Sequence, residues 1–65
     1  MLSKYAIISD RTPNYCNIDE IIETDGDMLD VSRERDLPLS RIMWVSDEST
    51  AQPGDRVRYN DDTIP

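Results

Sequence analysis

The apolar residues of this 65-residue chain gather in four short segments, YAII, IDEII, IMWV and VRY, which polar stretches separate. YAII and IMWV are apolar at successive positions and contain aromatic and β-branched residues, which is typical of strands whose two faces are both covered. Each of these two segments follows a basic residue and is followed by Ser-Asp. The pattern predicts strands near residues 3–9 and 41–47.

The last apolar segment follows a different pattern. Residues 55–60, DRVRYN, alternate strictly, so that Val57 and Tyr59 share one face of a strand and the two arginines share the other. This alternation predicts a half-buried strand, and the preceding Gln-Pro-Gly sequence predicts the turn that introduces it. The tail, residues 61–65, is expected to fray.

The middle of the chain allows two interpretations. In the first, Asp25-Gly26 forms a type I′ turn between two strands, since this dipeptide readily adopts the positive φ angles that such a turn needs. In the second, a capping-box pattern from Asn17 to Glu20 starts a short helix within residues 17–25. Isoleucine, threonine and aspartate are mediocre helix formers, so the hairpin is favoured.

These elements predict a small, single β-rich domain over residues 1–65, with an α+β fold as the alternative. Four or five short strands would form a partly open SH3-like barrel or an antiparallel sheet, with at most one short helix in the middle. The segment QPGDRVRYN resembles the strand-opening segments of small SH3-like barrels, in which a Pro-Gly-Asp turn leads into an alternating strand. This resemblance implies a barrel but no particular binding site.

The size of the chain limits its stability. A domain this short buries only about 60% of the surface that its unfolded form exposes. The single cysteine excludes an internal disulfide, and the absence of histidine leaves a structural zinc site without ligands. A second copy or another protein is then the remaining stabilising contact. Cys16 is expected to be a small buried hydrophobe, and Trp44 is expected to pack in the core.

The net charge of −7 is the strongest bias in the composition. Residues 17–37 alone contain eight acidic residues and two arginines. Such a field repels free nucleic acid and anionic membranes, because binding to phosphate depends on cationic side chains. We therefore expect a basic protein as partner, and neither direct nucleic-acid binding nor membrane binding. No apolar run approaches the roughly 18 residues of a membrane span or resembles a signal peptide, so the cytoplasm is the expected location.

The hairpin interpretation divides the middle of the chain into two faces. One face carries the apolar stripe expected in the core: Ile18, Ile22, Leu29 and Val31. The other face is acidic, with two apolar anchors at its centre. Together with two aspartates near the turn, this face gives the predicted partner-binding surface: Asp19, Ile21, Glu23, Asp25, Asp27, Met28 and Asp30.

No motif in the chain indicates catalysis or a cofactor. Residues 19–30, DEIIETDGDMLD, contain six carboxylates and a glycine, but the ligand spacing of an EF-type calcium loop fails, so no metal site is expected. Histidine, the commonest general base, is absent, and both glycines lie in predicted turns rather than in a phosphate-binding loop. We therefore expect no enzymatic activity, no catalytic residue and no cofactor.

The profile as a whole is similar to that of the small acidic inhibitor proteins encoded by bacteriophages and mobile elements. The similarity implies a non-catalytic viral protein that binds a basic, nucleic-acid-binding enzyme or regulator in the host cytoplasm, with carboxylates in the place of phosphates. The alternative is a small structural or adaptor protein that acts as a homodimer or larger homo-oligomer, through an exposed strand or Trp44. In that case the acidic charge serves solubility only.

Overall fold

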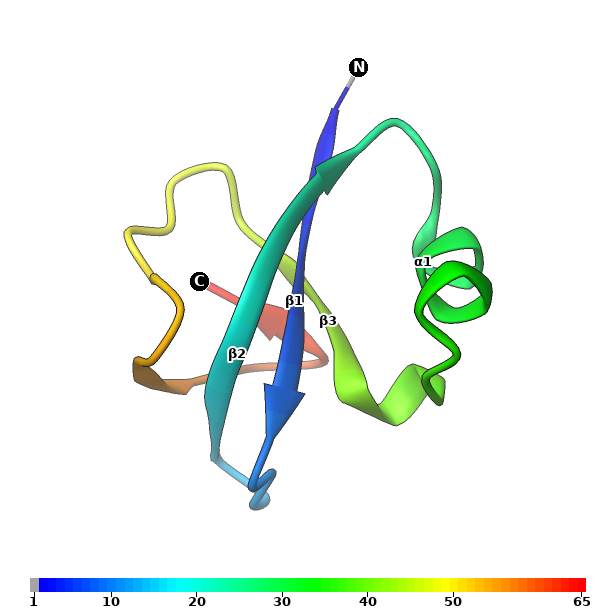
Figure 1. Ribbon diagram of the computed structural model, residues 1–65. Coiled ribbons are helices and arrows are strands. Elements are labelled where there is room, and N and C mark those ends of the chain that lie inside the picture. Colours follow the sequence, from blue (N-terminus) through cyan, green and yellow to red (C-terminus); the bar gives the residue numbers. More distant parts are fainter. Residues whose placement is uncertain (1) are drawn as a thin grey trace.

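The computed structural model describes residues 2–65 and contains a five-stranded sheet, one α-helix and one short 3-10 helix (Figure 1). The strands predicted at 3–9, 41–47 and 55–60 are all present. In chain order the elements are β1 (Ser3–Ser9), β2 (Tyr15–Thr24), α1 (Met28–Arg35), the 3-10 helix η1 (Leu39–Arg41), β3 (Ile42–Val45), β4 (Arg56–Arg58) and β5 (Thr63–Ile64).

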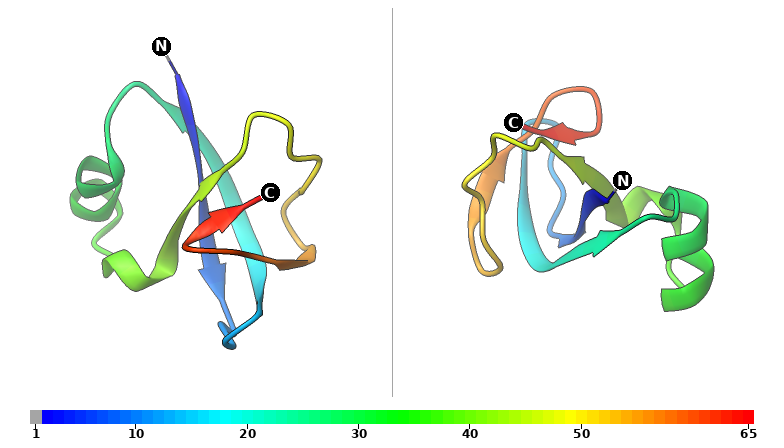
Figure 2. Two further views of the ribbon diagram at one scale, coloured as in Figure 1. Left: turned by 180° about the vertical axis from the view of Figure 1, so that it is seen from behind. Right: turned by 90° about the horizontal axis from the view of Figure 1, so that it is seen from above.

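The strands form one mixed sheet in the order β4-β2-β1-β3-β5. β1 pairs antiparallel with β2 and with β3, and β2 pairs antiparallel with β4, whereas β3 and β5 run parallel. The sheet curls into a half-barrel, which the view from above in Figure 2 shows. The protein is thus a small β-rich domain, as predicted.

The inner face of the half-barrel holds the larger of two hydrophobic cores. Val57 of β4 and Tyr59 pack against this core with their side chains partly buried, as their alternation with the arginines predicted. The other four strands contribute the buried side chains: Ala6, Ile8, Cys16, Ile18, Met43, Val45 and Ile64.

A second core lies between α1 and the outer face of the sheet. Its buried members are Tyr5, Ile7, Val31 and Ile42, and its partly buried members are Ile22, Met28 and Leu37. Val31 is the buried residue of α1. An isolated helix of eight residues is unstable in water, so packing of this face, rather than helix propensity, holds α1 in place.

A bulge in β2 separates two isoleucines that were expected on one face. The pairing of β1 with β2 shifts by one residue between Ile7 and Ile8, which leaves Asp19 as the extra residue of β2. An extra residue in one strand reverses the alternation of its side chains. Ile18 therefore lies in the inner core and Ile22 at the outer core, and the predicted apolar stripe that contained both is wrong.

Neither interpretation of the middle of the chain is correct. Residues 17–24 continue β2 as a strand, and the chain then turns into α1 rather than into a second strand. A type I′ turn requires positive φ at both central residues, and neither Asp25 nor Gly26 has it. The helix begins instead at Met28, where Asp27 and Asp30 form a capping box in which aspartate replaces the usual glutamate.

The C-terminal segment, which was expected to fray, contains a short strand. Thr63 and Ile64 form β5 beside β3, and Ile64 is only 1% exposed. Arg11 holds the preceding turn through an ion pair with Asp62. Burial of one isoleucine next to the C-terminus thus orders a segment whose polar sequence suggested mobility.

Candidate protein-interaction surface

The structure divides the predicted partner-binding residues among three places. Because the segment after the turn is helical, Asp30 does not lie opposite Ile21, as the hairpin would require; Ile21 pairs with Ala6 instead. The continuous acidic face expected from the hairpin is therefore not formed. Asp19, Ile21 and Glu23 lie on β2, Asp25 and Asp27 lie in the following turn, and Met28 and Asp30 lie on α1.

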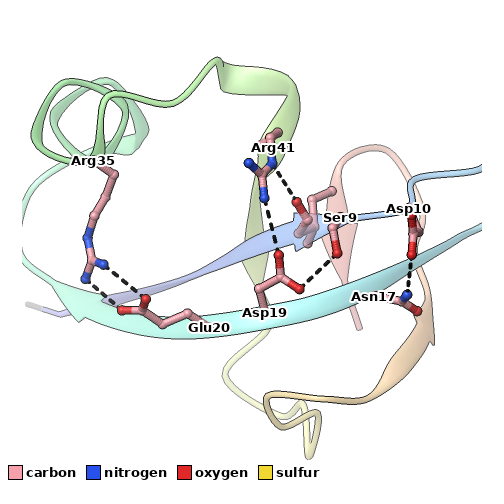
Figure 3. A network of polar contacts seen from close by, with 8 residues as sticks. Ser9, Asp10, Asn17, Asp19, Glu20, Arg35 and Arg41 are labelled. Atoms are coloured by element: carbon pink, nitrogen blue, oxygen red, sulfur yellow. Dashed lines mark hydrogen bonds and ion pairs between the residues drawn. The ribbon is translucent and has the colours of Figure 1, made fainter.

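Asp19, at the bulge of β2, takes part in a network of polar contacts (Figure 3). It accepts a hydrogen bond from Ser9 Oγ at 2.9 Å, and its Oδ2 lies 3.3 Å from Arg41 Nη2. Arg41 also donates from Nε to the carbonyl of Ile8 at 3.0 Å. The carboxylate of Asp19 thus links β2 to η1 and to the end of β1.

The two glutamates of β2 that follow Asp19 are also paired. Arg35 of α1 donates to both carboxylate oxygens of Glu20, at 3.0 and 2.7 Å, and Figure 3 shows this bidentate contact between helix and sheet. Lys4 Nζ lies 3.9 Å from Glu23 Oε1. These side chains are partly exposed, so each pair contributes about 1 kcal/mol or less. They nevertheless reduce the negative charge that β2 presents to a partner.

Asp27 and Asp30 satisfy the N-terminus of α1. Asp27 Oδ1 accepts from the Asp30 N–H at 2.9 Å, and Asp30 Oδ2 accepts from the Asp27 N–H at 3.1 Å. Gly26 makes room for this arrangement, because a Cβ at position 26 would lie 2.9 Å from Asp30 Oδ2. Both carboxylates lie at the positive end of the helix dipole, where negative charge is favoured. Their side chains cap the helix while they remain exposed.

The two predicted apolar anchors, Ile21 and Met28, contact the cores, whereas Leu29, which was predicted to lie in the core, is exposed. Ile21 is partly buried against the inner core and Met28 against the outer core. Leu29, expected in the core, is instead 52% exposed on α1. For Met28 and Leu29 the cause is the helical geometry, because successive side chains of a helix turn by about 100° rather than alternating between two faces. Ile21 lies on β2 beyond the bulge, opposite Ala6 of the inner core.

The exposed positions of α1 and of the turns at its two ends are mostly acidic and include Leu29 and Arg33. Helical spacing places Arg33 one turn from Leu29, and Glu34 one turn from Asp30. Arg35 is also exposed but pairs with Glu20 of β2. We call the other exposed residues of this region the helix surface: Asp25, Asp27, Leu29, Asp30, Arg33, Glu34 and Asp36.

None of the five carboxylates of the helix surface forms an ion pair within residues 2–65, and three of them also take no part in the N-terminal helix cap. Asp25, Glu34 and Asp36 are exposed and pair with no lysine or arginine within residues 2–65. Leu29, Glu34 and Asp36 were not among the partner-binding residues predicted from the sequence. Two aspartates three residues apart, directly before Val31, were the signal that would have revealed the helix and with it this surface.

A second exposed feature lies on β3. Trp44 is 55% exposed, so the prediction that it packs in the core is wrong. α1 packs on its neighbours Tyr5 and Ile42 and leaves the indole uncovered. Together with Leu2 and Asp47, among other residues, Trp44 lines a shallow hollow of about 340 Å³.

Cys16 is fully buried in the inner core, as predicted. Burial raises the pKa of its thiol, and the positive charges of Arg11 and Arg56 offset that effect only in part. Within residues 2–65, no group of three or more cysteine, aspartate and glutamate side chains is arranged to hold a metal ion. Over the same residues, no helix is both long enough and apolar enough to cross a membrane.

Comparison with known proteins identified no relative of this chain. No family model matches the chain, and no curated protein or solved structure is significantly similar to it. The inference of function therefore starts from the helix surface and Trp44 themselves.

Proposed function

We propose that this protein is a non-catalytic inhibitor or modulator that binds a basic protein through the helix surface. The observation that supports this function is the position of Leu29 on a surface where Asp25, Glu34 and Asp36 are exposed and form no ion pair within residues 2–65. A nucleic-acid-binding enzyme or regulator offers a groove of complementary charge. The carboxylates take the positions of phosphates, and Leu29 supplies an apolar contact among them.

The proposed surface keeps part of the surface predicted from the sequence and changes the rest. Asp25, Asp27 and Asp30 belong to both. Asp19 and Glu23 contribute less, because each already has a cationic neighbour. The small size and the acidic charge extend the proposal to a protein of phage or mobile-element type that acts in the host cytoplasm.

A capture experiment with matched charge variants tests this function. The first variant neutralises three carboxylates of the helix surface and breaks no ion pair within residues 2–65: Asp25→Asn, Glu34→Gln and Asp36→Asn. The second neutralises three other exposed carboxylates and loses the same charge: Asp47→Asn, Glu48→Gln and Asp61→Asn. The immobilised wild type should recover a basic nucleic-acid-binding protein from a bacterial lysate, with recovery falling as salt rises.

The two variants should then behave differently. We expect the helix-surface variant to lose most of the captured protein and the control variant to retain it. Equal loss with both variants would mean that only total charge matters, which contradicts a defined surface. Loss with the control variant alone would place the interface on the side that carries Asp47 and Trp44. Recovery of nothing but copies of this chain would contradict the inhibitor function.

The exposure of Trp44 favours a second candidate, a structural or adaptor protein that acts as a homodimer. Tryptophan is enriched among the residues that anchor protein interfaces. This candidate predicts a dimer in sedimentation equilibrium that Trp44→Ala dissociates and that the helix-surface variant leaves intact. A wild-type protein that stays monomeric at high concentration would exclude it.

A further inference from the structure

β4 forms an open edge of the sheet. It pairs with β2 and has no neighbour on its other side within residues 2–65. Its sequence is Arg56-Val57-Arg58, and both arginines are exposed. An edge strand of this kind presents backbone groups to which another chain can add as a further strand.

The hydrogen bonds beside β4 show which backbone groups face outward. Tyr59 N–H donates to the carbonyl of Asn14 at 3.2 Å, and Ile18 N–H donates to the carbonyl of Asp55 at 2.9 Å. Positions 55, 57 and 59 therefore turn their backbone groups toward β2, because these groups alternate in direction along a strand. The N–H and C=O groups of Arg56 and Arg58 consequently point away from β2, toward the open edge.

The side chains beside this edge are basic and aromatic, in a chain whose net charge is −7. Arg56 lies with its guanidinium 5.9 Å from the centre of the Tyr15 ring and donates to Asn17 Oδ1 at 3.1 Å. Neither Arg56 nor Arg58 pairs with a carboxylate within residues 2–65. Tyr15 is 44% exposed. The edge thus combines free backbone groups with two arginines on one face.

The positive charge of Arg56 and Arg58 determines which kind of strand can add to this edge. Two copies of β4 paired antiparallel would place arginine opposite arginine on the same face, and like charges directly opposite one another are destabilising. A strand with carboxylates at alternate positions would instead place one opposite each arginine, with paired Cα atoms about 5.5 Å apart. We propose that the open edge of β4 binds an extended acidic segment of another protein, with the pattern acid-x-acid, as an additional antiparallel strand.

This site is independent of the proposed function. Figures 1 and 2 show β4 and α1 on opposite sides of the molecule, so the acidic strand and a basic partner on the helix surface do not compete for the same residues. Failure of one proposal would leave the other standing.

A labelled peptide of sequence TEVEVT tests the proposal by fluorescence anisotropy and by amide hydrogen exchange. Binding should slow exchange at Arg56 and Arg58, whereas Val57, whose amide already faces β2, should change little. Methylation of the backbone nitrogens of both glutamates should abolish binding, because it removes the N–H groups that bond to β4. The rearranged peptide VTEEVT, with the same charge and adjacent acids, should bind more weakly.

Two single arginine variants separate strand addition from general attraction. Arg58→Gln should weaken peptide binding about threefold to fivefold, the effect that one cross-strand ion pair supports. Arg33→Gln removes the same charge from α1, where Arg33 is likewise exposed, and should have no effect. Equal weakening by both variants, undiminished binding of the methylated peptide, or no binding at millimolar peptide would each overturn the proposal.

Discussion

Asp27 serves two purposes at one position, because its carboxylate caps α1 and also lies on the helix surface. Asp27→Ala removes the bond to the Asp30 N–H and should lower the free energy of unfolding by about 1 kcal/mol. Urea denaturation followed by circular dichroism measures this change. Asp25→Ala, at an exposed neighbouring position outside the cap, should stay within about 0.5 kcal/mol of wild type. Equal effects of the two substitutions would mean that the cap does not stabilise the helix.

Burial of Cys16 should make the free energy of unfolding fall as the pH becomes alkaline. Burial raises the pKa of its thiol, so the folded state favours the neutral form more strongly than the unfolded state does. The associated stability is complete below the thiol pKa of the unfolded chain, roughly 8.5, and is lost as pH rises through the folded pKa. Wild type should therefore lose more stability than Cys16→Ala between pH values of about 7 and 9.5. Parallel urea curves for the two proteins at both pH values would contradict this expectation.

The environments of single residues followed from sequence only where the pattern around them is local. The burial of Cys16 and the shared face of Val57 and Tyr59 needed no more than residue type and alternation. The exposure of Trp44 and Leu29 did not follow, because it depends on where α1 lies on the sheet. That placement is set by contacts between segments distant in the chain.

The attachment of α1 depends on Val31, whereas its outward side contributes little to stability. Val31→Ala should lower the free energy of unfolding by about 2 kcal/mol, from lost burial and the remaining cavity. Leu29→Ala should change it by less than about 0.5 kcal/mol, because Leu29 is half exposed. Leu29→Ala should nevertheless reduce capture of the basic partner. A large loss of stability with Leu29→Ala would show that this residue belongs to the core.

The strand β5 should be essential to the fold despite its length of two residues. Ile64→Ala should cost about 2 to 4 kcal/mol, an amount comparable with the whole stability of a domain this small. Thermal unfolding should show a large loss of midpoint temperature or no cooperative transition. Deletion of the exposed Pro65 is the control and should leave the midpoint nearly unchanged. A wild-type melting curve for Ile64→Ala would mean that the tail is dispensable.

The strands β1, β3 and β4 were predictable from their apolar patterns, whereas α1 and β5 were not. The apolar segments of β1 and β3 and the alternation of β4 are complete within a few residues. α1 has eight residues and buries Val31 alone, so its sequence carries almost no helical periodicity. β5 has no pattern of its own, because its pairing with β3 follows from the path of the whole chain.

Ion pairs between residues distant in the sequence determine which carboxylates of the molecule are neutralised. Arg35 pairs with Glu20 across 15 residues and Arg41 with Asp19 across 22, which withdraws charge from β2. Five carboxylates without an ion pair within residues 2–65 belong to the helix surface, and the unpaired arginines of β4 lie on the opposite side of the molecule. The sequence predicted an acidic surface within residues 19–30, whereas the helix surface that we propose extends to Asp36 and depends on the fold.

The function assigned to the helix surface can be tested most directly by calorimetry with the captured basic protein. The dissociation constant is measured at several salt concentrations for wild type, for the Asp25→Asn, Glu34→Gln, Asp36→Asn variant and for the control variant. Loss of three exposed ion pairs should weaken binding about tenfold and flatten its salt dependence, while the control stays within about threefold of wild type. Equal dissociation constants for all three proteins would contradict the assignment of binding to this surface.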